Sequence, residues 1–448
     1  MSVRFSFTFY RGFAIINAVK KYLKEGAHAM PESIIYHIDV NSAFLSWEAA
    51  YRLEQDPSAP DIRTFPSVIG GNEEMRHGIV LAKSPSAKRY GICTGEPLVQ
   101  ARRKCPNLQV YPPHFDLYVE RSNQFMELLR RYAPSVEAYS IDEAFCDMTG
   151  TTKLYGDPVS FAHTLKDMIR DELHFTVNIG VSCNRLLAKM ASDFEKPDHV
   201  HTLFPDEIAS KLWPLPVEDL FFVGKSSARR LRGLGITTIG ELARSNHDMI
   251  ISIFKSHGDT IWNYANGIES TPLTHTEPAN KGYGNSLTIH FDVTDSDTAK
   301  RVLLSLCETV GARLRATGAY ISVVQVQITD NEFHNTCHQT TLDSSTNVTE
   351  KIYECACRLF DAAWDHTPIR LLGVYTSKAT SESYEQYNLF DMERNEKLAK
   401  LNSAVDKIRG RYGEDSIKRA CFVEHTSSGK NISHMTSGMN KAKRKPDT

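Results

Sequence analysis

Residues 139–145 read Tyr-Ser-Ile-Asp-Glu-Ala-Phe, and they place two adjacent carboxylates inside an apolar, β-prone run. A buried carboxylate is costly unless it has a partner cation or a metal ion. Because successive side chains on a strand point to opposite faces, Asp142 and Glu143 can reach one ion only at a strand end or a tight turn. Residues 136–148 predict a hairpin with both acids at its turn. The simplest alternative is an acidic hairpin tip that faces solvent.

A third acid ends another predicted strand upstream. Residues 34–38 are mostly apolar, and Asp39 follows them directly before the polar residues 41 and 42. Three carboxylates from two strand ends would form an oxygen-only site, the kind that suits Mg²⁺ shared with substrate phosphates. The sequence therefore favours a magnesium site over a solvent-facing turn.

The bulk composition limits the class of protein. A chain of 448 residues with 41% hydrophobic content can build about two to four domains. No apolar run approaches the roughly 18 residues of a membrane span, so we expect no membrane contact. The nine cysteines include no Cys-x-x-Cys pair, which indicates no zinc site and a reducing, cytoplasmic location. The net charge of −2 means that any DNA contact must come from local patches.

Four stretches resemble, in the same order, motifs of the Y-family translesion DNA polymerases. The resemblance is greatest to the bacterial polymerase IV and V branches, and later matches reach about residue 423. It implies a multidomain α/β (α+β) right-hand polymerase with a ferredoxin-like palm, small fingers, a helical thumb and a βαββαβ little finger. The four stretches are residues 38–44, 91–97, 140–145 and 180–184.

The resemblance also divides the chain into domains. The catalytic palm should be built from two separate segments, with the fingers inserted between them. We expect an N-terminal extension that is disordered, and a disordered tail. The expected ranges are 1–32 for the extension, 33–44 and 109–205 for the palm, 45–108 for the fingers, 206–274 for the thumb, 275–283 for a linker, 284–376 for the little finger, 377–423 for a clamp-binding peptide with a C-terminal helix, and 424–448 for the tail.

The resemblance assigns a reaction to the acids. Asp39, Asp142 and Glu143 would hold two Mg²⁺ ions, with the Val40 carbonyl as a further ligand. The enzyme would add deoxynucleotides from their triphosphates to a primer 3′-hydroxyl, opposite damaged or undamaged template, with pyrophosphate as the leaving group. The small fingers imply low fidelity, and no segment suggests a proofreading nuclease. Phe44 would be the steric gate that rejects a ribose 2′-hydroxyl. The alternative for Phe44 is a core residue at the start of a helix.

The triphosphate site departs from the family pattern. Family members usually present an aromatic residue and an arginine from the fingers helix, and here Pro85 and Lys88 occupy those positions. Lysine keeps the charge of arginine but loses its bidentate fork. We expect Ser84, the helix N-terminus and Lys189 to complete the site. Simple surface solvation is the alternative for Lys88.

The thumb should contain a helix-hairpin-helix at Val223, Gly224 and Lys225, where backbone amides hold a DNA phosphate without reading bases. Phe222 stands where the family has the first glycine of the hairpin. A nucleotide-binding P-loop is the competing motif for this stretch. The P-loop motif fails because Asp219 occupies the position where the motif requires its leading glycine.

Two further features concern partners. The predicted little finger is acidic, with seven Lys and Arg against eleven Asp and Glu over residues 284–376, whereas the family's domain is usually basic. Its phosphate contacts should therefore be sparse or made by backbone amides. Gln386, Leu389 and Phe390 resemble the bacterial peptide that binds the sliding β-clamp, although such a peptide could instead anchor the next helix. We expect a monomer that binds primer-template DNA and the clamp.

Two other functions compete with the polymerase. A catalytically silent Y-family relative could act as a scaffold on DNA and clamp, but it should have lost its acids, and all three are retained. A nucleotide cyclase could be built on a similar palm, but it would need neither thumb hairpin nor little finger. Primer extension would separate both from a polymerase.

Overall fold

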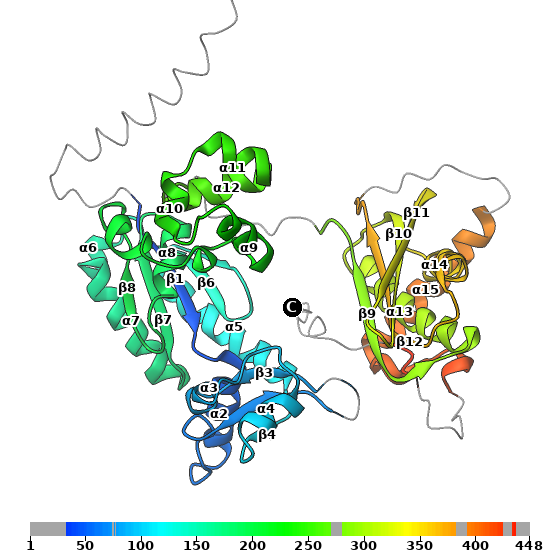
Figure 1. Cartoon of the computed structure of the whole chain (residues 1–448). Helices are drawn as coiled ribbons and strands as arrows, with labels where there is room; N and C mark the ends of the chain where they lie inside the picture. Colours follow the sequence, from blue (N-terminus) through cyan, green and yellow to red (C-terminus); the bar gives the residue numbers. More distant parts are fainter. Residues whose placement is uncertain are drawn as a thin grey trace, which may run out of the picture. The chain divides into compact units, whose positions relative to one another are not determined.

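The structure is a computed structural model, and it describes residues 33–73, 76, 78–269, 280–381, 392–423 and 432–435. The expected N-terminal extension and the clamp-binding peptide lie outside these residues. The chain forms two compact units (Figure 1). The first comprises residues 1–66, 84–86 and 117–276, and the second comprises residues 67–83, 87–116 and 277–448. No helix within the described ranges is long and apolar enough to cross a membrane.

The first unit contains a five-stranded sheet in the order β5-β6-β1-β7-β8. β1 is central and pairs antiparallel with β6 and β7, while β7 and β8 are parallel. All six residues of β1 are buried. The strands are β1 (Ile35–Val40), β5 (Ser135–Ala138), β6 (Glu143–Asp147), β7 (Val177–Ser182) and β8 (Val200–Thr202).

Helices cover both faces of this sheet. Ile35 and Phe145 pack against Ala188 of α8 on one face, while the Tyr36 hydroxyl donates to the carbonyl of Pro158 at the start of α7 on the other. A Cβ on Gly180 would lie 1.9 Å from the Ala188 carbonyl oxygen, so α8 can lie this close to β7 only over a glycine. The helices are α2 (Ala43–Gln55), α5 (Phe115–Tyr132), α6 (Thr152–Tyr155), α7 (Pro158–Leu173) and α8 (Arg185–Ser192).

A cluster of short helices follows the sheet and packs on the outer side of α8 (Figure 1). Leu187 and Met190 of α8 belong to the same buried cluster as Leu231 and Ile250 of these helices. This matches the helical thumb that the sequence predicts. The elements are η1 (Pro205–Glu207), η2 (Ile208–Leu212), η3 (Val217–Asp219), α9 (Lys225–Gly233), α10 (Ile239–Arg244), α11 (His247–Phe254) and α12 (Ser256–Ala265).

The second unit contains a small three-stranded sheet in the order β3-β2-β4. β2 (Ser67–Gly70) pairs antiparallel with β3 (Val80–Lys83) and parallel with β4 (Gln109–Tyr111). The predicted boundary at residue 109 therefore needs correction, because Gln109–Tyr111 completes this sheet and does not begin the palm. Its central residue, Val110, packs on the core of the small sheet. The associated helices are α3 (Pro85–Arg89) and α4 (Leu98–Lys104).

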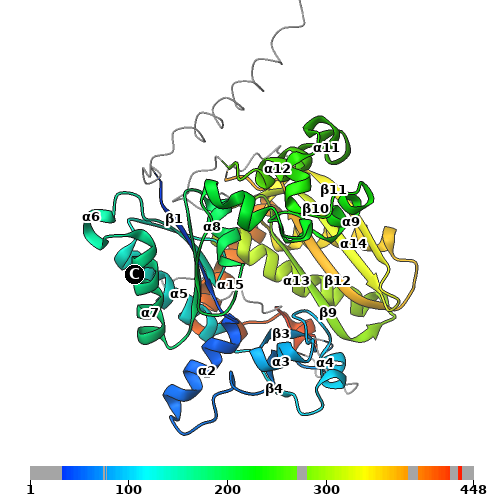
Figure 2. The same cartoon turned by 60° about the vertical axis from the view of Figure 1, so that its left-hand side comes forward.

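The little finger has the predicted βαββαβ order, and its antiparallel sheet runs β11-β10-β12-β9. Strand residues alternate, so that Val324, Val326 and Ile328 of β10 face the buried core that α13 and α14 complete (Figure 2). The elements are β9 (Gly284–Val293), α13 (Ser296–Ala316), β10 (Ile321–Asp330), β11 (Asn335–Thr346), α14 (Thr349–Ala363) and β12 (Ile369–Ser377).

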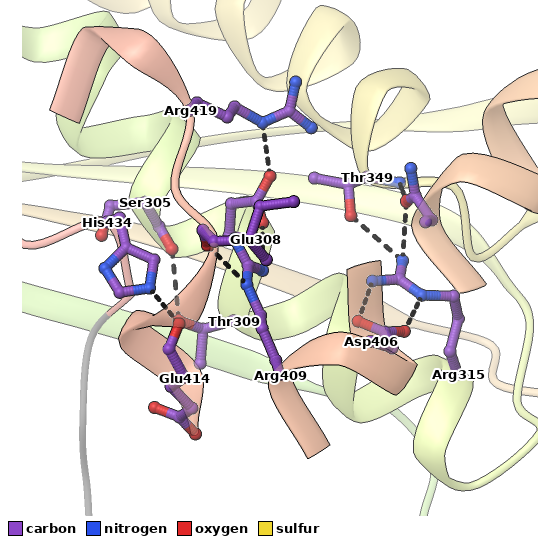
Figure 3. A network of polar contacts seen from close by, with 12 residues as sticks. Ser305, Glu308, Thr309, Arg315, Thr349, Asp406, Arg409, Glu414, Arg419 and His434 are labelled. Atoms are coloured by element: carbon purple, nitrogen blue, oxygen red, sulfur yellow. Dashed lines mark hydrogen bonds and ion pairs between the residues drawn. The ribbon is translucent and has the colours of Figure 1, made fainter. Parts of the chain in front are cut away.

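Chain beyond the little finger docks on the outer side of α13 and α14, and we call residues 392–423 and 432–435 the C-terminal layer. Figure 3 shows the polar contacts that hold it. Buried Glu308 of α13 accepts from Arg409 at 2.7 Å and from Arg419 at 2.6 Å. The layer contains α15 (Met392–Tyr412), η4 (Glu414–Ser416) and η5 (Ala420–Phe422).

A second set of contacts extends the C-terminal layer along α13. Arg315 donates to Asp406 of α15, with its Nε 2.6 Å from Oδ2. Ser305 donates to the carbonyl of Ser433 at 2.6 Å. Residues 432–435 therefore depart from the predicted disordered tail, because the hydrogen bond from Ser305 holds them to the little finger and His434 and Met435 are buried.

Candidate active site

The backbone brings the three predicted acids to one corner of the palm sheet. Asp39 near the end of β1 is the register partner of Glu143, the first residue of β6. The Val40 amide donates to the carbonyl of Asp142 at 3.0 Å, and Asp142 ends the turn between β5 and β6. The predicted hairpin with acids at its turn is therefore present.

Asp39 is bound by a cation from the chain itself. Its side chain is largely buried, and Lys196 Nζ donates to its Oδ2 at 2.6 Å. Lys196 also lies 2.8 Å from Oδ1 of Asp193. Burial raises the pKa of Asp39 to about 6, although the ammonium of Lys196 opposes this rise. The carboxylate thus has less positive charge around it than its burial requires.

Glu143 has a different environment, in which its side chain is partly exposed. Lys189 Nζ on α8 donates to its Oε1 at 2.7 Å. Burial would raise the pKa of Glu143, but the polar contacts with His37 and Lys189 outweigh burial and lower it to about 2. His37 is fully buried, with Nε2 3.8 Å from Glu143 Oε2 and Nδ1 2.7 Å from Ser192 Oγ.

The third acid has its own partner, because Ser140 Oγ donates to Asp142 Oδ1 at 2.6 Å. Across the part of the chain that the structure describes, no three His, Cys, Asp or Glu side chains gather as a metal-binding group. The backbone thus brings the three carboxylates to one corner of the sheet, and each has its own side-chain partner, Lys196, Lys189 or Ser140. The donors themselves fit a hard cation: all are oxygens, and Asp39 lacks full charge compensation.

Phe44 lies in the first turn of α2, five residues beyond Asp39. Its ring stacks on Tyr118 of α5, with centroids 4.7 Å apart and an interplanar angle of 11°. The residue remains partly exposed. One face of the ring is thus backed by protein, as a wall beside a substrate requires.

The predicted triphosphate residues differ in their placement. Lys189 lies at the acids, as described above. Lys88 is exposed on α3. Ser84 departs from the prediction, because it is fully buried and its hydroxyl donates to the Phe65 carbonyl at 2.8 Å.

Lys196 is the site residue that the sequence reasoning missed. It lies seven positions beyond Lys189, in the loop after α8. A lysine among Asp193 and Glu195 reads as a solvated charge, and only the fold places its ammonium against Asp39. Two lysines from one region therefore meet two acids from adjacent strands.

The thumb hairpin has the expected backbone. Gly224 is the N-cap of α9, no side chain caps that terminus, and Lys225 is the first helical residue, so the first amides of α9 point outward. Val223 is buried. Phe222 has a φ of 73°, in the left-handed region that glycine favours. Phe222 therefore holds a backbone conformation that glycine adopts more readily.

Three family models match this chain: the impB/mucB/samB family at residues 38–193, its C-terminal domain at 280–389, and its helix-hairpin-helix motif at 205–236. The chain belongs to the impB/mucB/samB family of Y-family DNA polymerases. It is similar to DNA polymerase IV of Clostridium acetobutylicum, at 46% identity over 87% of this chain and 98% of the relative. DNA polymerase IV of Acetivibrio thermocellus is 34% identical over 87% of this chain and 98% of the relative.

A solved structure supports the fold of this Y-family chain. A Y-family polymerase chimera of Dbh and Dpo4 superposes with a TM-score of 0.66 over 78% of this chain and all of that one, at 21% identity. As a Y-family member, the chain is a DNA-directed DNA polymerase of the translesion type. Polymerases of this family depend on metal ions in general, and their substrates are DNA and deoxynucleoside triphosphates.

Proposed function

We propose that the chain extends a primer 3′-hydroxyl at the corner formed by Asp39, Asp142 and Glu143, with two Mg²⁺ ions. The observation that carries this proposal is the β1–β6 register, which sets Asp39 opposite Glu143 beside the Asp142 backbone. When bound, the ions would activate the 3′-hydroxyl and neutralise the triphosphate and its pyrophosphate leaving group. The Val40 carbonyl would be a further ligand.

The lysines of the site would exchange partners when substrate arrives. Lys196 donates to Asp39 and Lys189 donates to Glu143 in the structure. A metal-bound triphosphate would bring both a cation for the carboxylates and phosphate oxygens for the ammonium groups. Each lysine could then move from an acid to a phosphate without leaving a buried charge unpaired. Lys88 on the fingers would add a charge from the surface, while Ser84 could contribute only through its backbone.

The deoxyribose would rest against Phe44. An apolar pocket rejects an added hydroxyl only about 10²-fold, so stronger exclusion of ribonucleotides needs a rigid wall. The thumb would hold a DNA phosphate at the N-terminus of α9, through the amides that follow Val223, Gly224 and Lys225.

The proposal is tested by primer extension with Asp142→Ala and Glu143→Ala. Both should lose extension and keep DNA binding, because removing a ligand costs chemistry and leaves the β-sheet core intact. Asp147→Asn is the matched control, since Asp147 lies on the same strand and its carboxylate accepts from the Thr149 amide. Wild-type extension by either alanine variant would overturn the assignment. Loss of DNA binding together with extension would point to misfolding, which circular dichroism would reveal.

We also propose that Gln386, Leu389 and Phe390 bind a sliding β-clamp, and that the chain acts as a cytoplasmic monomer. The support for clamp binding is the sequence pattern of these three residues. Buried apolar anchors carry most of a short peptide's affinity, so Leu389 and Phe390 should dominate binding. Leu389→Ala with Phe390→Ala should remove clamp-stimulated synthesis and leave distributive synthesis unchanged. Persistent clamp stimulation would show that the peptide has another role.

A further inference from the structure

The ring of Phe44 has a second aromatic layer behind it. Tyr118 of α5 is fully buried and lies parallel to Phe44, and Trp47 is tilted against both rings, with centroids 6.0 Å from Phe44 and 6.1 Å from Tyr118. Phe44 is partly exposed, whereas Tyr118 and Trp47 are fully buried. The partly exposed ring therefore rests on a fully buried aromatic layer, and buried side chains in protein interiors are close-packed.

One polar contact reaches the hydroxyl of Tyr118, at the limit of hydrogen-bond length. Its hydroxyl lies 3.5 Å from Oε2 of Glu48, which is fully buried on α2. Glu48 Oε1 accepts from Arg52 Nε at 2.8 Å. The carboxylate thus stands between a cation and the tyrosine, and this arrangement joins the helix that carries Phe44 to the helix that supports it.

The helix α5 also reaches the catalytic turn. Ser122, one turn beyond Tyr118, donates to the carbonyl of Ile141, the residue directly before Asp142. One face of α5 therefore contacts the proposed sugar wall at Tyr118 and the acid turn at Ser122. These two contacts can be altered separately.

We infer that Tyr118 is a positioning residue that sets sugar selectivity by preventing Phe44 from receding before a 2′-hydroxyl. The inference rests on the proposed function, in which Phe44 is the wall beside the deoxyribose. A single partly exposed phenylalanine can change rotamer to admit one more oxygen atom. Phe44 can retreat along its ring normal only by displacing Tyr118, and Tyr118 is closed in by Trp47 and Glu48. Selectivity should therefore depend on the second layer as well as the first.

The experiment measures the ratio of kcat/KM for a deoxynucleotide to that for the matching ribonucleotide in single-nucleotide primer extension. Tyr118→Leu removes the flat support, and Tyr118→Met does so with a flexible, unbranched side chain of similar volume to leucine, so that at least one folded variant is available. Tyr118→Phe keeps the ring without the hydroxyl. Phe44→Ala reports independently on the wall itself.

Two controls lie on the same helix. Phe125 is buried on α5 about 10 Å further along its axis, and its ring packs edge-on to Phe175, so Phe125→Leu tests general loosening of the core. Ser122→Ala tests the contact with the acid turn. It should lower kcat for both sugars equally.

We expect Tyr118→Leu and Tyr118→Met to lower the deoxy-to-ribo ratio at least about tenfold, towards the ~10²-fold limit of an unsupported apolar pocket. Tyr118→Phe should retain the wild-type ratio, and so should Phe125→Leu and Ser122→Ala. If the ratio is unchanged in the Leu or Met variant but lowered in Phe44→Ala, the role of Tyr118 is overturned and the proposed wall at Phe44 stands. An unchanged ratio in Phe44→Ala would overturn the proposed wall. If Phe125→Leu lowers the deoxy-to-ribo ratio by as much as the Tyr118 variants do, the effect comes from general loosening of the core and not from Tyr118.

Discussion

Lys196 Nζ lies 2.6 Å from Asp39 Oδ2, so an acid that we propose as a metal ligand already pairs with a cation of the chain itself before any substrate binds. The same ammonium contacts Asp193, which keeps it at the edge of the site when Asp39 takes another partner. Lys196 would then contact a phosphate of the substrate, while Asp193 keeps its ammonium group in place.

Lys196→Ala should therefore raise the KM for deoxynucleoside triphosphates by about tenfold or more, since a hydrogen bond to a charged group contributes about 1.5 to 3 kcal/mol. Lys196→Arg should recover part of the loss, because it restores the charge. Steady-state extension kinetics at saturating DNA provide the measurement. Lys211→Ala is the control, since Lys211 pairs with Glu207 in the thumb region. A fall in kcat with no change in KM would limit Lys196 to neutralising Asp39.

Local patterns were enough to locate the acids. Asp39 and Glu143 lie at the ends of apolar strand-forming runs, and the hairpin is set by residues close together in sequence. The partners of these acids could not be predicted in the same way. Lys196 reaches Asp39 across 157 positions of the chain, and no local pattern distinguishes it from a solvated lysine.

Two other differences also have long-range causes. Residues 109–111 join a parallel partner strand forty residues upstream, so strand propensity alone could not show which sheet they complete. The Ser84 hydroxyl donates to the backbone carbonyl of Phe65. Phe65 lies in a loop of irregular structure. The order of elements in the little finger was predictable because its two helices are long and β10 alternates between buried and partly buried residues over much of its length.

The open face of the little-finger sheet should bind DNA with little dependence on salt. Gln325 and Gln327 alternate with the buried residues of β10, and Gln325 pairs with Gln339 of β11, so this part of the face is uncharged. Each phosphate neutralised by Lys or Arg adds about 0.9 to the slope of log K against log salt. Gln325→Lys should therefore steepen the slope by about 0.9 and strengthen binding at low salt.

Fluorescence anisotropy of primed DNA across a salt series measures this slope. Ala404→Lys is the matched control, because it adds the same charge at an exposed position of α15, in the layer that covers the helices instead of the open sheet face. Equal effects of the two variants would mean that net charge alone governs binding. A steep wild-type slope would contradict the prediction directly.

The C-terminal layer should contribute to the stability of the little finger through Arg409. The Arg409 and Glu308 side chains are 7% and 5% exposed and 2.7 Å apart, and breaking a buried pair typically costs about 3 to 5 kcal/mol. Arg409→Ala should cost near the lower end, since Arg419 still contacts Glu308. Arg394→Ala, which removes an exposed pair with Glu354, should cost about 1 kcal/mol or less.

Hydrogen exchange of α13 and α15 in the full chain reports this difference by region. Replacing both partners, as Glu308→Leu with Arg409→Met, should recover much of the lost protection, because no unpaired buried charge remains. If Arg409→Ala leaves exchange in α13 unchanged, the layer rests on the little finger without stabilising it.

Glu350 should make the same layer sensitive to acid. Burial would raise its pKa, but hydrogen bonds from Arg419 and Asn402 outweigh burial and hold the pKa below the usual 4.5. A carboxyl group with a lowered folded pKa stabilises the fold above its unfolded pKa and loses that contribution as pH falls through the folded value. Wild type should therefore be more protected than Glu350→Gln at pH 7, and the difference should shrink below about pH 4.5.

Hydrogen exchange of α15 at matched intrinsic rates measures this difference in protection. Glu354→Gln on the same helix is the control, because its partner Arg394 is exposed. A difference that persists unchanged to pH 3 would show that Glu350 acts by shape and not by charge.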